Sequence, residues 1–143
     1  MLRGLKVISN MSTRAIIALP VENGYITAWN WNDGNPSNLG AELRTHFTDT
    51  KVINELISHH SFGSIAGPRF CKRFYQQFKE RFDNCQIKFI ELSNRRYLIS
   101  HVNDGRVIEG EGPNGFFADI DTMLQCDLNY VYVFENGKWK TYK

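Results

Sequence analysis

The chain has 143 residues, of which 42% are hydrophobic and 22% are charged, and its formal net charge is +2. This length fits one domain, and the ordinary composition excludes a disordered chain, collagen and a coiled coil. Ten Phe, six Tyr and three Trp supply apolar surface for a core. The small net charge argues against a surface devoted as a whole to nucleic acid or membrane.

Residues 1–10 precede a second methionine, Met11, and carry Arg3 and Lys6. They lack the apolar run of a signal peptide, and no stretch of the chain is apolar for long enough to span a membrane. Two interpretations stay open. Residues 1–10 are either an upstream extension before a true start at Met11 or an arm of the protein that is flexible or packed.

A hairpin is predicted near the N-terminus. Residues 13–19 form a β-branched and apolar run, and residues 25–31 alternate between polar and apolar side chains. Asn23-Gly24 between them is a strong turn signal. The alternation places Trp29 and Trp31 on one face with Tyr25 and Thr27, and residues 33–36 (Asp-Gly-Asn-Pro) break the second strand.

Three helices are expected next. Leu39, Leu43 and Phe47 recur at helical spacing, with Ser37 as the expected cap. Thr50 is the expected cap of a second helix that reaches Ile57. Pro68 can open a third, which carries an aromatic stripe at every fourth residue; its members are Phe70, Phe74, Phe78 and Phe82. The stripe is interpreted as core, in preference to a ligand or partner groove.

Beyond residue 84 the hydrophobic period changes to two. Strands are expected over residues 86–92 and 95–102, with a short piece at 107–108 and a short helix within 116–126. Residues 129–134 and 138–142 predict a closing hairpin around Asn136-Gly137. We therefore predict a single α+β domain over residues 11–143, with a mostly antiparallel sheet and about three helices inserted after the N-terminal hairpin.

Several motifs resemble a family of small, largely uncharacterised proteins of phages and prophages. They are Ser12-Thr13-Arg14, Asp33-Gly34-Asn35-Pro36, the set Gly40, Leu43, His46 and Phe47, then Thr48-Asp49 followed by Val52 or Ile53, Leu56 and Ile57, and finally Asn136-Gly137 with Trp139. The family usually reads His-Trp-Asp-Gly-Tyr-Pro at the turn, where this chain has Trp-Asn-Asp-Gly-Asn-Pro over residues 31–36. Residues 62–115 show no match. The resemblance implies a mobile-element protein that acts in the bacterial host cytoplasm on a host or defence component.

No cofactor or metal site is expected from the sequence. The four histidines have no ligand spacing, and the odd set of Cys71, Cys85 and Cys126 without Cys-x-x-Cys is typical of free thiols in a reducing compartment. Residues 62–67 lack the lysine and the spacing of a phosphate-binding loop. The acidic residues between 109 and 127 match no calcium loop; they are Glu109, Glu111, Asp119, Asp121 and Asp127.

Two candidate binding surfaces remain. The first is the turn after the second strand, with Trp31, Asn32, Asp33 and Asn35 as ligand-binding candidates and Arg14 beside them. Rings, amides and a carboxylate next to a helix N-terminus can hold an anion or a nucleotide. The alternative is that the tryptophans face the core and the asparagines only make the turn.

The second surface is the basic side of the third helix, formed by Arg69, Lys72, Arg73 and Lys79. Residues 69–96 carry eight basic and three acidic side chains, a net +5, whereas residues 103–135 carry one basic and seven acidic ones, a net −6. The basic side is a candidate for binding a partner, phosphate or nucleic acid. The alternatives are a solvated helix face, or attraction between the two segments within a subunit or between copies of the chain.

The favoured hypothesis is a non-enzymatic binding protein that captures or blocks a bacterial host or defence protein or a nucleotide. A small hydrolase or nuclease with His46 as base near Asp33 is the first alternative. The second is a component of the virion or its assembly. No membrane partner is expected, and a homo-oligomer stays open.

Overall fold

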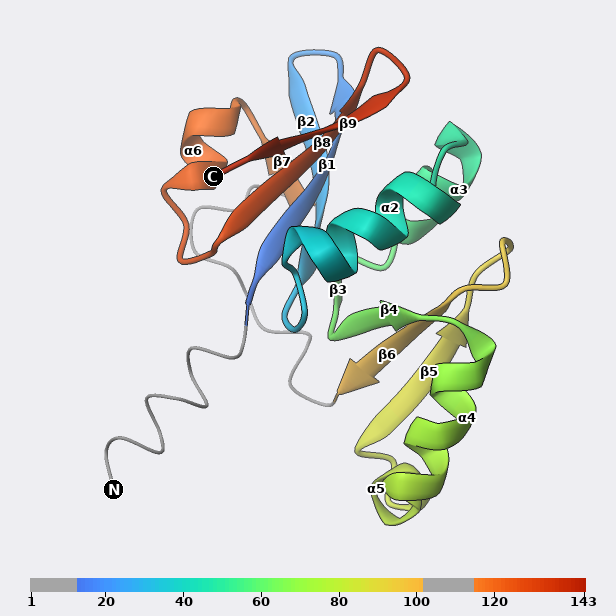
Figure 1. Ribbon diagram of the computed structural model, residues 1–143. Helices are drawn as coiled ribbons and strands as arrows, with labels where there is room; N and C mark the ends of the chain where they lie inside the picture. The colour runs from blue at the N-terminus through green and yellow to red at the C-terminus, as the bar shows by residue number, and fades with distance from the viewer. Residues whose placement is uncertain (1–12, 102–114) are drawn as a thin grey trace.

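The computed structural model describes residues 13–101 and 115–143, which form two β-sheets and the helices that pack on them (Figure 1). The larger sheet has six strands. Five follow the order β3-β2-β1-β8-β9, and β7 pairs with β2. The smaller sheet has the order β4-β6-β5.

The main strands and helices occur in the order expected from the sequence. The larger sheet contains β1 (Ala15–Val21), β2 (Gly24–Asn30), β3 (Ser61–Phe62), β7 (Phe116–Phe117), β8 (Tyr130–Glu135) and β9 (Lys138–Tyr142). The smaller one contains β4 (Ser64–Ala66), β5 (Ile87–Glu91) and β6 (Tyr97–His101). The helical segments are η1 (Pro36–Gly40), α2 (Ala41–His46), α3 (Thr50–Ile57), α4 (Pro68–Gln77), α5 (Lys79–Asp83) and α6 (Ile120–Leu124). The predicted α+β class, with a hairpin first and helices before the later strands, is confirmed.

The two predicted hairpins become neighbours in the larger sheet. β1 and β2 pair antiparallel around a turn in which Asn23 has a positive φ of 69°. β8 and β9 pair antiparallel as well, and β8 lies parallel to β1 with Tyr130 opposite Ala15. This parallel pairing brings together strands from near the two ends of the described chain, so no local turn signal in the sequence predicts it.

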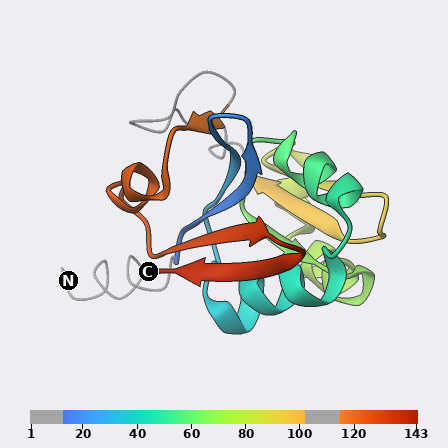
Figure 2. The ribbon, with the colours of Figure 1, turned by 90° about the horizontal axis from the view of Figure 1, so that it is seen from above.

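Both faces of the larger sheet are covered. Ile17 and Leu19 face α2 and α3, in a core shared with Leu43 and Leu56. The opposite face packs against α6, and the core between them contains Ile16, Ala18, Trp29, Trp31, Phe117 and, from α6, Met123. In Figure 2, α6 (orange) and the smaller sheet lie on opposite sides of the larger sheet. Alternate residues of β1 therefore serve two different cores.

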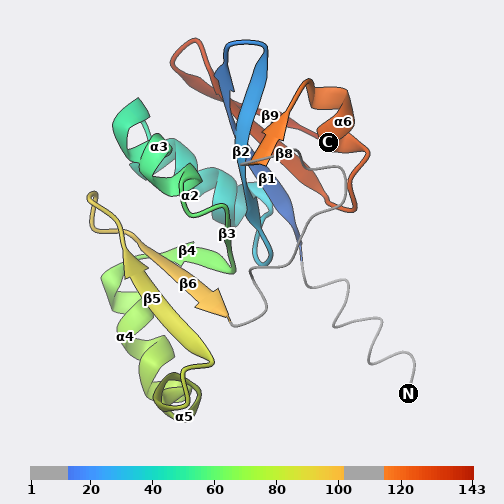
Figure 3. The same ribbon diagram turned by 180° about the vertical axis from the view of Figure 1, so that it is seen from behind.

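The smaller sheet carries α4 and α5 on one face (Figure 3). Cys71, Ile87 and Ile99 are buried there among half-buried aromatic rings. The predicted third helix divides at Phe78, whose φ of −118° and ψ of 30° end α4 before α5 begins. Phe74, Phe78 and Phe82 pack on the sheet as expected, but Phe70 is 47% exposed.

Two predicted helix caps are wrong. The first helical segment begins at Pro36 with a π-type turn, Asn35 stands at its N-cap, and no side chain caps it, so Ser37 is not the cap. At α3 the Asp49 carboxylate accepts a hydrogen bond from the Lys51 N–H. Asp49 is therefore the cap, because Thr50 is already the first helical residue.

Some expectations fall on residues outside the described ranges. These are the N-terminal segment 1–10, the short strand at 107–108, and the charged residues Asp104, Arg106, Glu109 and Glu111 of the acidic segment 103–135. Within the described ranges, no helix is both long enough and apolar enough to cross a membrane.

Candidate functional site

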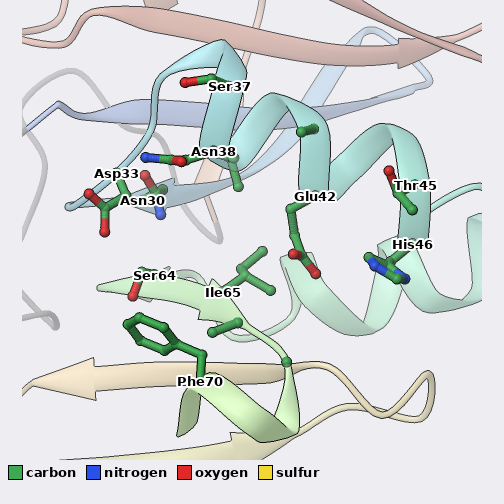
Figure 4. A pocket seen from close by; sticks show the side chains of 14 residues that line it. Asn30, Asp33, Ser37, Asn38, Glu42, Thr45, His46, Ser64, Ile65 and Phe70 are labelled. Atoms are coloured by element: carbon green, nitrogen blue, oxygen red, sulfur yellow. The ribbon is translucent and has the colours of Figure 1, made fainter. Parts of the chain in front are cut away.

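A cleft of about 550 Å³ lies between the first helical segment and the smaller sheet (Figure 4). One wall comes from η1 and α2, and the other comes from β4 and the start of α4. Its lining residues are Asn30, Asp33, Ser37, Asn38, Leu39, Ala41, Glu42, Thr45, His46, Ser64, Ile65, Ala66, Gly67 and Phe70. This volume falls within the roughly 300–1,000 Å³ that is usual for ligand pockets.

The helical wall presents polar side chains at helical spacing. Asn38, Glu42 and His46 follow one another at intervals of four residues, so they share the face that is turned to the cleft. Leu43 faces the core, and Leu39 lies between the core and the cleft, because it is buried and also lines the cleft. The pattern that buries this helix therefore also aligns its polar groups along the cleft.

The sheet wall is more apolar. Ile65 and Ala66 line it, and Phe70 stands where α4 begins, with Ser64 beside its ring in Figure 4. The Phe70 ring stacks on Phe74, with centroids 5.8 Å apart and planes inclined by 29°. Since Phe70 is 47% exposed, it offers aromatic surface at the rim of the cleft.

Polar contacts join the turn between β5 and β6 to the helices beside the cleft. Arg96 Nε donates to Glu42 Oε2 at 2.5 Å and Arg96 Nη2 donates to Glu42 Oε1 at 2.7 Å. Asn94 Nδ2 donates to the His46 backbone O at 2.8 Å, and the Glu55 carboxylate accepts bonds from Ser93 N and Oγ. These contacts attach the β5–β6 turn of the smaller sheet to α2 and α3.

The Arg96 guanidinium lies close to the cleft but is already neutralised. A Cβ placed on Gly67 would lie only 2.6 Å from Arg96 Nη1, so the glycine makes room for this side chain. Glu42 and Arg96 are only 12% and 19% exposed, and they form a bidentate pair. The cleft is lined by no lysine or arginine, and Asp33 has no ion-pair partner within the part of the chain that the structure describes.

Asn30 forms part of the floor of the cleft. It is fully buried, and its Nδ2 donates to Gly63 O at 3.0 Å. Its Oδ1 has no hydrogen-bond partner among residues 13–101 and 115–143. A Cβ on Gly34 would lie 2.8 Å from that oxygen, so a glycine at this position lets the turn close over Asn30.

Only part of the predicted turn site reaches the cleft. Asp33, with a positive φ of 58°, lines it. Trp31 is buried on the other face of the larger sheet beside Trp29, with ring centroids 5.1 Å apart, and its Nε1 donates to Ser61 Oγ. Both tryptophans thus face the core, as the alternative interpretation predicted. Arg14 pairs with Asp127 at 3.2 Å, just beyond α6.

The two asparagines of the turn, Asn32 and Asn35, form hydrogen bonds with neighbouring residues. Asn35 Nδ2 donates to Ser37 Oγ at 2.7 Å, and Asn35 Oδ1 accepts from Asn38 Nδ2 at 3.0 Å. The Asn32 N–H donates to Gly63 O at 2.8 Å. Neither lines the cleft, although Asn35 fixes the orientation of Asn38, which does.

The predicted basic face is divided between two helices. Arg69, Lys72 and Arg73 are exposed on α4, and none of them has an ion-pair partner within the described ranges. Lys79 belongs to α5 and pairs with Asp83 at 3.1 Å. None of these three cations, which form the basic face of α4 (Arg69, Lys72 and Arg73), lines the cleft itself. Phe70 does line it, and Arg73 follows Phe70 by three residues, so this face begins beside the rim of the cleft.

His46 and Asp33 both line the cleft, as the hydrolase alternative requires. Figure 4 places them at opposite ends of it, with Glu42 between them. Among the described residues, no three side chains of His, Cys, Asp or Glu gather to hold a metal ion.

The sequence did not point to Glu42, Ser64 or the open surface of Phe70, although Asn38 lies at the end of the candidate turn, residues 29–38. No local signal marks them, because the cleft forms only when α2 and β4, from separate stretches of the chain, come together. No family model, curated protein or solved structure matches this chain. The resemblance to the phage and prophage family therefore stays a prediction, and the functional argument depends on the chain's own residues.

Proposed function

We propose that this chain is a non-enzymatic binding protein of the phage or prophage type, which captures or blocks a host or defence-related macromolecule or nucleotide in the bacterial cytoplasm. One observation carries the proposal. Arg69, Lys72 and Arg73 are exposed and lack ion-pair partners among the described residues, on a helix that borders a cleft of about 550 Å³. The partner is therefore expected to present negative charge to α4.

The three cations do not help α4 to form. Arg69 and Arg73 are four residues apart, and like charges at this spacing destabilise a helix by about 0.2–0.5 kcal/mol. Arg69 also lies in the first turn, where the helix dipole disfavours positive charge and where no acidic residue compensates. The arrangement slightly opposes local stability, and an external anionic partner would offset this repulsion.

A charge-reversal variant tests this proposal. Native mass spectrometry of the protein isolated from its bacterial host should show a bound macromolecule or nucleotide. The triple variant Arg69→Glu, Lys72→Glu and Arg73→Glu should lose it. A matched control, Lys51→Glu, Lys138→Glu and Lys140→Glu, changes the net charge equally at exposed positions away from α4. Retention of the partner by the first variant would overturn the proposed role of α4.

A hydrolase or nuclease is the second candidate, because His46 and Asp33 line the same cleft. Incubation with nucleic acids and cyclic nucleotides, in Mg²⁺ and in EDTA, separates the two functions. Turnover that His46→Ala abolishes would establish catalysis and overturn the binding proposal. The expected result is binding without turnover.

A further inference from the structure

We infer that the cleft receives a base of a single-stranded nucleic acid whose phosphates lie along the basic face of α4. This inference rests on the proposed function and names the class of its partner. Two adjoining surfaces of opposite character carry it. The basic face is exposed and cationic, whereas the cleft is lined by no lysine or arginine and contains the exposed Asp33 carboxylate.

The division of charge matches the chemistry of a nucleotide chain. Phosphates are anionic and suit the free cations of α4. Bases are neutral, and adenine, cytosine and guanine carry amino donors that suit carboxylate and amide acceptors. An acidic peptide has its charge on the side chains, which Asp33 would repel from the cleft. A nucleic acid therefore fits both surfaces, while an acidic peptide fits only the outer one.

Phe70 stands at the boundary between the two surfaces. Its ring is 47% exposed at the rim of the cleft, and one side of it is supported by stacking on Phe74. A supported ring with open surface is a platform on which a base can stack. Arg73 follows Phe70 by three residues, so the two side chains are neighbours on α4. A base on Phe70 thus leaves its phosphate near a cation.

Polar groups across the cleft can bind the edge of the base. Asp33 and Asn38 lie across the cleft from Phe70 in Figure 4. Asn38 Nδ2 is already bonded to Asn35 Oδ1 at 3.0 Å, which fixes the amide and leaves its Oδ1 to accept a hydrogen bond. Single strands suit this site because their bases are free to leave the stack, whereas those of a duplex are paired.

Fluorescence anisotropy with labelled strands tests the inference. The probes are a mixed-sequence DNA and a mixed-sequence RNA of about 12 nucleotides, an abasic strand of equal length, a duplex, and polyglutamate. The wild-type protein should bind at least one mixed strand about 5-fold or more tighter than the abasic strand. Phe70→Ala should weaken binding of that mixed strand by about 5- to 150-fold and leave abasic binding unchanged. Phe70→Trp, which keeps a stacking surface, should retain the affinity.

Tyr75→Ala is the matched control. Tyr75 is an aromatic residue of the same helix, 37% exposed, and does not line the cleft. It should leave all affinities unchanged, and thermal unfolding should confirm that both alanine variants stay folded. Equal binding of the mixed and abasic strands, or an unchanged affinity in Phe70→Ala, would overturn the base site.

The remaining outcomes separate this inference from the proposed function. Binding of polyglutamate without binding of any strand would overturn the nucleic-acid inference and leave an acidic protein as the partner of α4. Preference for the duplex would overturn the base site in the same way. If the α4 charge-reversal variant keeps its cellular partner and no probe binds, both the inference and the proposed function fail.

Discussion

Helices α3 and α4 are both amphipathic, yet they lie in regions of different construction. α3 buries Val52, Ile53, Leu56 and Ile57 against the larger sheet. α4 is longer, and Cys71 is its only buried residue. The strands differ in the same way: the first five residues of β1 are all buried, whereas β5 buries only Ile87.

We infer from this difference that the first region contributes most of the stability and that the second carries the binding surface. Hydrophobic stabilisation scales with the apolar area removed from water, so the larger sheet with α2, α3 and α6 contributes most of it. The smaller sheet with α4 and α5 leaves rings and cations at the surface. Substitutions should therefore destabilise the protein strongly in the first region, while surface changes on α4 should affect binding.

Leu43→Ala should have the largest effect. The side chain is fully buried between α2 and the larger sheet, and its loss leaves a cavity that rigid neighbours cannot fill. We expect a loss of about 3–5 kcal/mol in the free energy of unfolding. Ile99→Ala, in the smaller cluster beneath α4, should lose only about 2–3 kcal/mol because half-buried rings can move into the space. Urea unfolding measures both, and equal losses would remove the contrast between the regions.

Arg96→Met should have the next largest effect, because it removes the ion pair that joins the two regions. In the wild-type protein the Glu42 side chain is only 12% exposed, and the substitution leaves its carboxylate there without its cation. We expect a loss of about 2–4 kcal/mol, and the double variant with Glu42→Met should recover part of it. A double-mutant cycle by chemical unfolding checks this.

Lys79→Met is the control. It breaks the exposed pair with Asp83 and should leave the unfolding midpoint unchanged.

Gly34→Ala, in the turn between the larger sheet and the cleft, should lower the free energy of unfolding by a smaller amount. Its Cβ would meet Asn30 Oδ1 at 2.8 Å and Thr13 O at 3.0 Å. The second of these is backbone and the first belongs to a buried side chain, so neither yields easily. We expect a loss of about 1–3 kcal/mol, measured by thermal unfolding. An unchanged melting temperature would show that the turn is not held against β1.

The cysteines should have the smallest effect near neutral pH, where their contribution to the pH dependence of stability has not yet begun. Burial raises the pKa of the Cys71 thiol to about 11, from an ordinary value of 9.0. The folded state therefore holds this proton more tightly than the unfolded state, and stability should fall as the pH rises from about 9 to about 11. Cys71→Ser should remove that fall. At pH 8 iodoacetamide should modify the exposed Cys85 well before Cys71, as mass spectrometry can show.

Local signals predicted much of the fold. Asn23-Gly24 and Asn136-Gly137 mark both hairpins, and Pro68 marks the start of α4, because these residues restrict the backbone wherever they occur. The alternation that puts Trp29 and Trp31 on one face is confirmed for the same reason. Finer features were wrong where two local solutions compete, as at the cap of α3, where Asp49 precedes Thr50.

The candidate site was less predictable. Asp33 and His46 were identified as candidates and lie in the cleft, yet Arg14 and Trp31 were grouped with Asp33 and lie elsewhere. Trp31 is close to Asp33 in sequence, but the larger sheet separates side chains that alternate along its strands. Arg14 pairs instead with Asp127. The stripe of phenylalanines hid the exposure of Phe70, since periodicity shows which residues share a face and not what covers that face.

The sequence by itself determined the main elements, their order and the amphipathic faces, because these depend on neighbours within a few residues. It did not predict the short strands β3 and β4 or the division of the third helix into α4 and α5. The tertiary structure decided the parallel contact between β1 and β8, the Glu42–Arg96 pair and the cleft beside Phe70. Each of these joins residues from distant parts of the chain, so its free energy appears only when those parts come together in the folded protein. The binding surface proposed for this protein belongs to that second group.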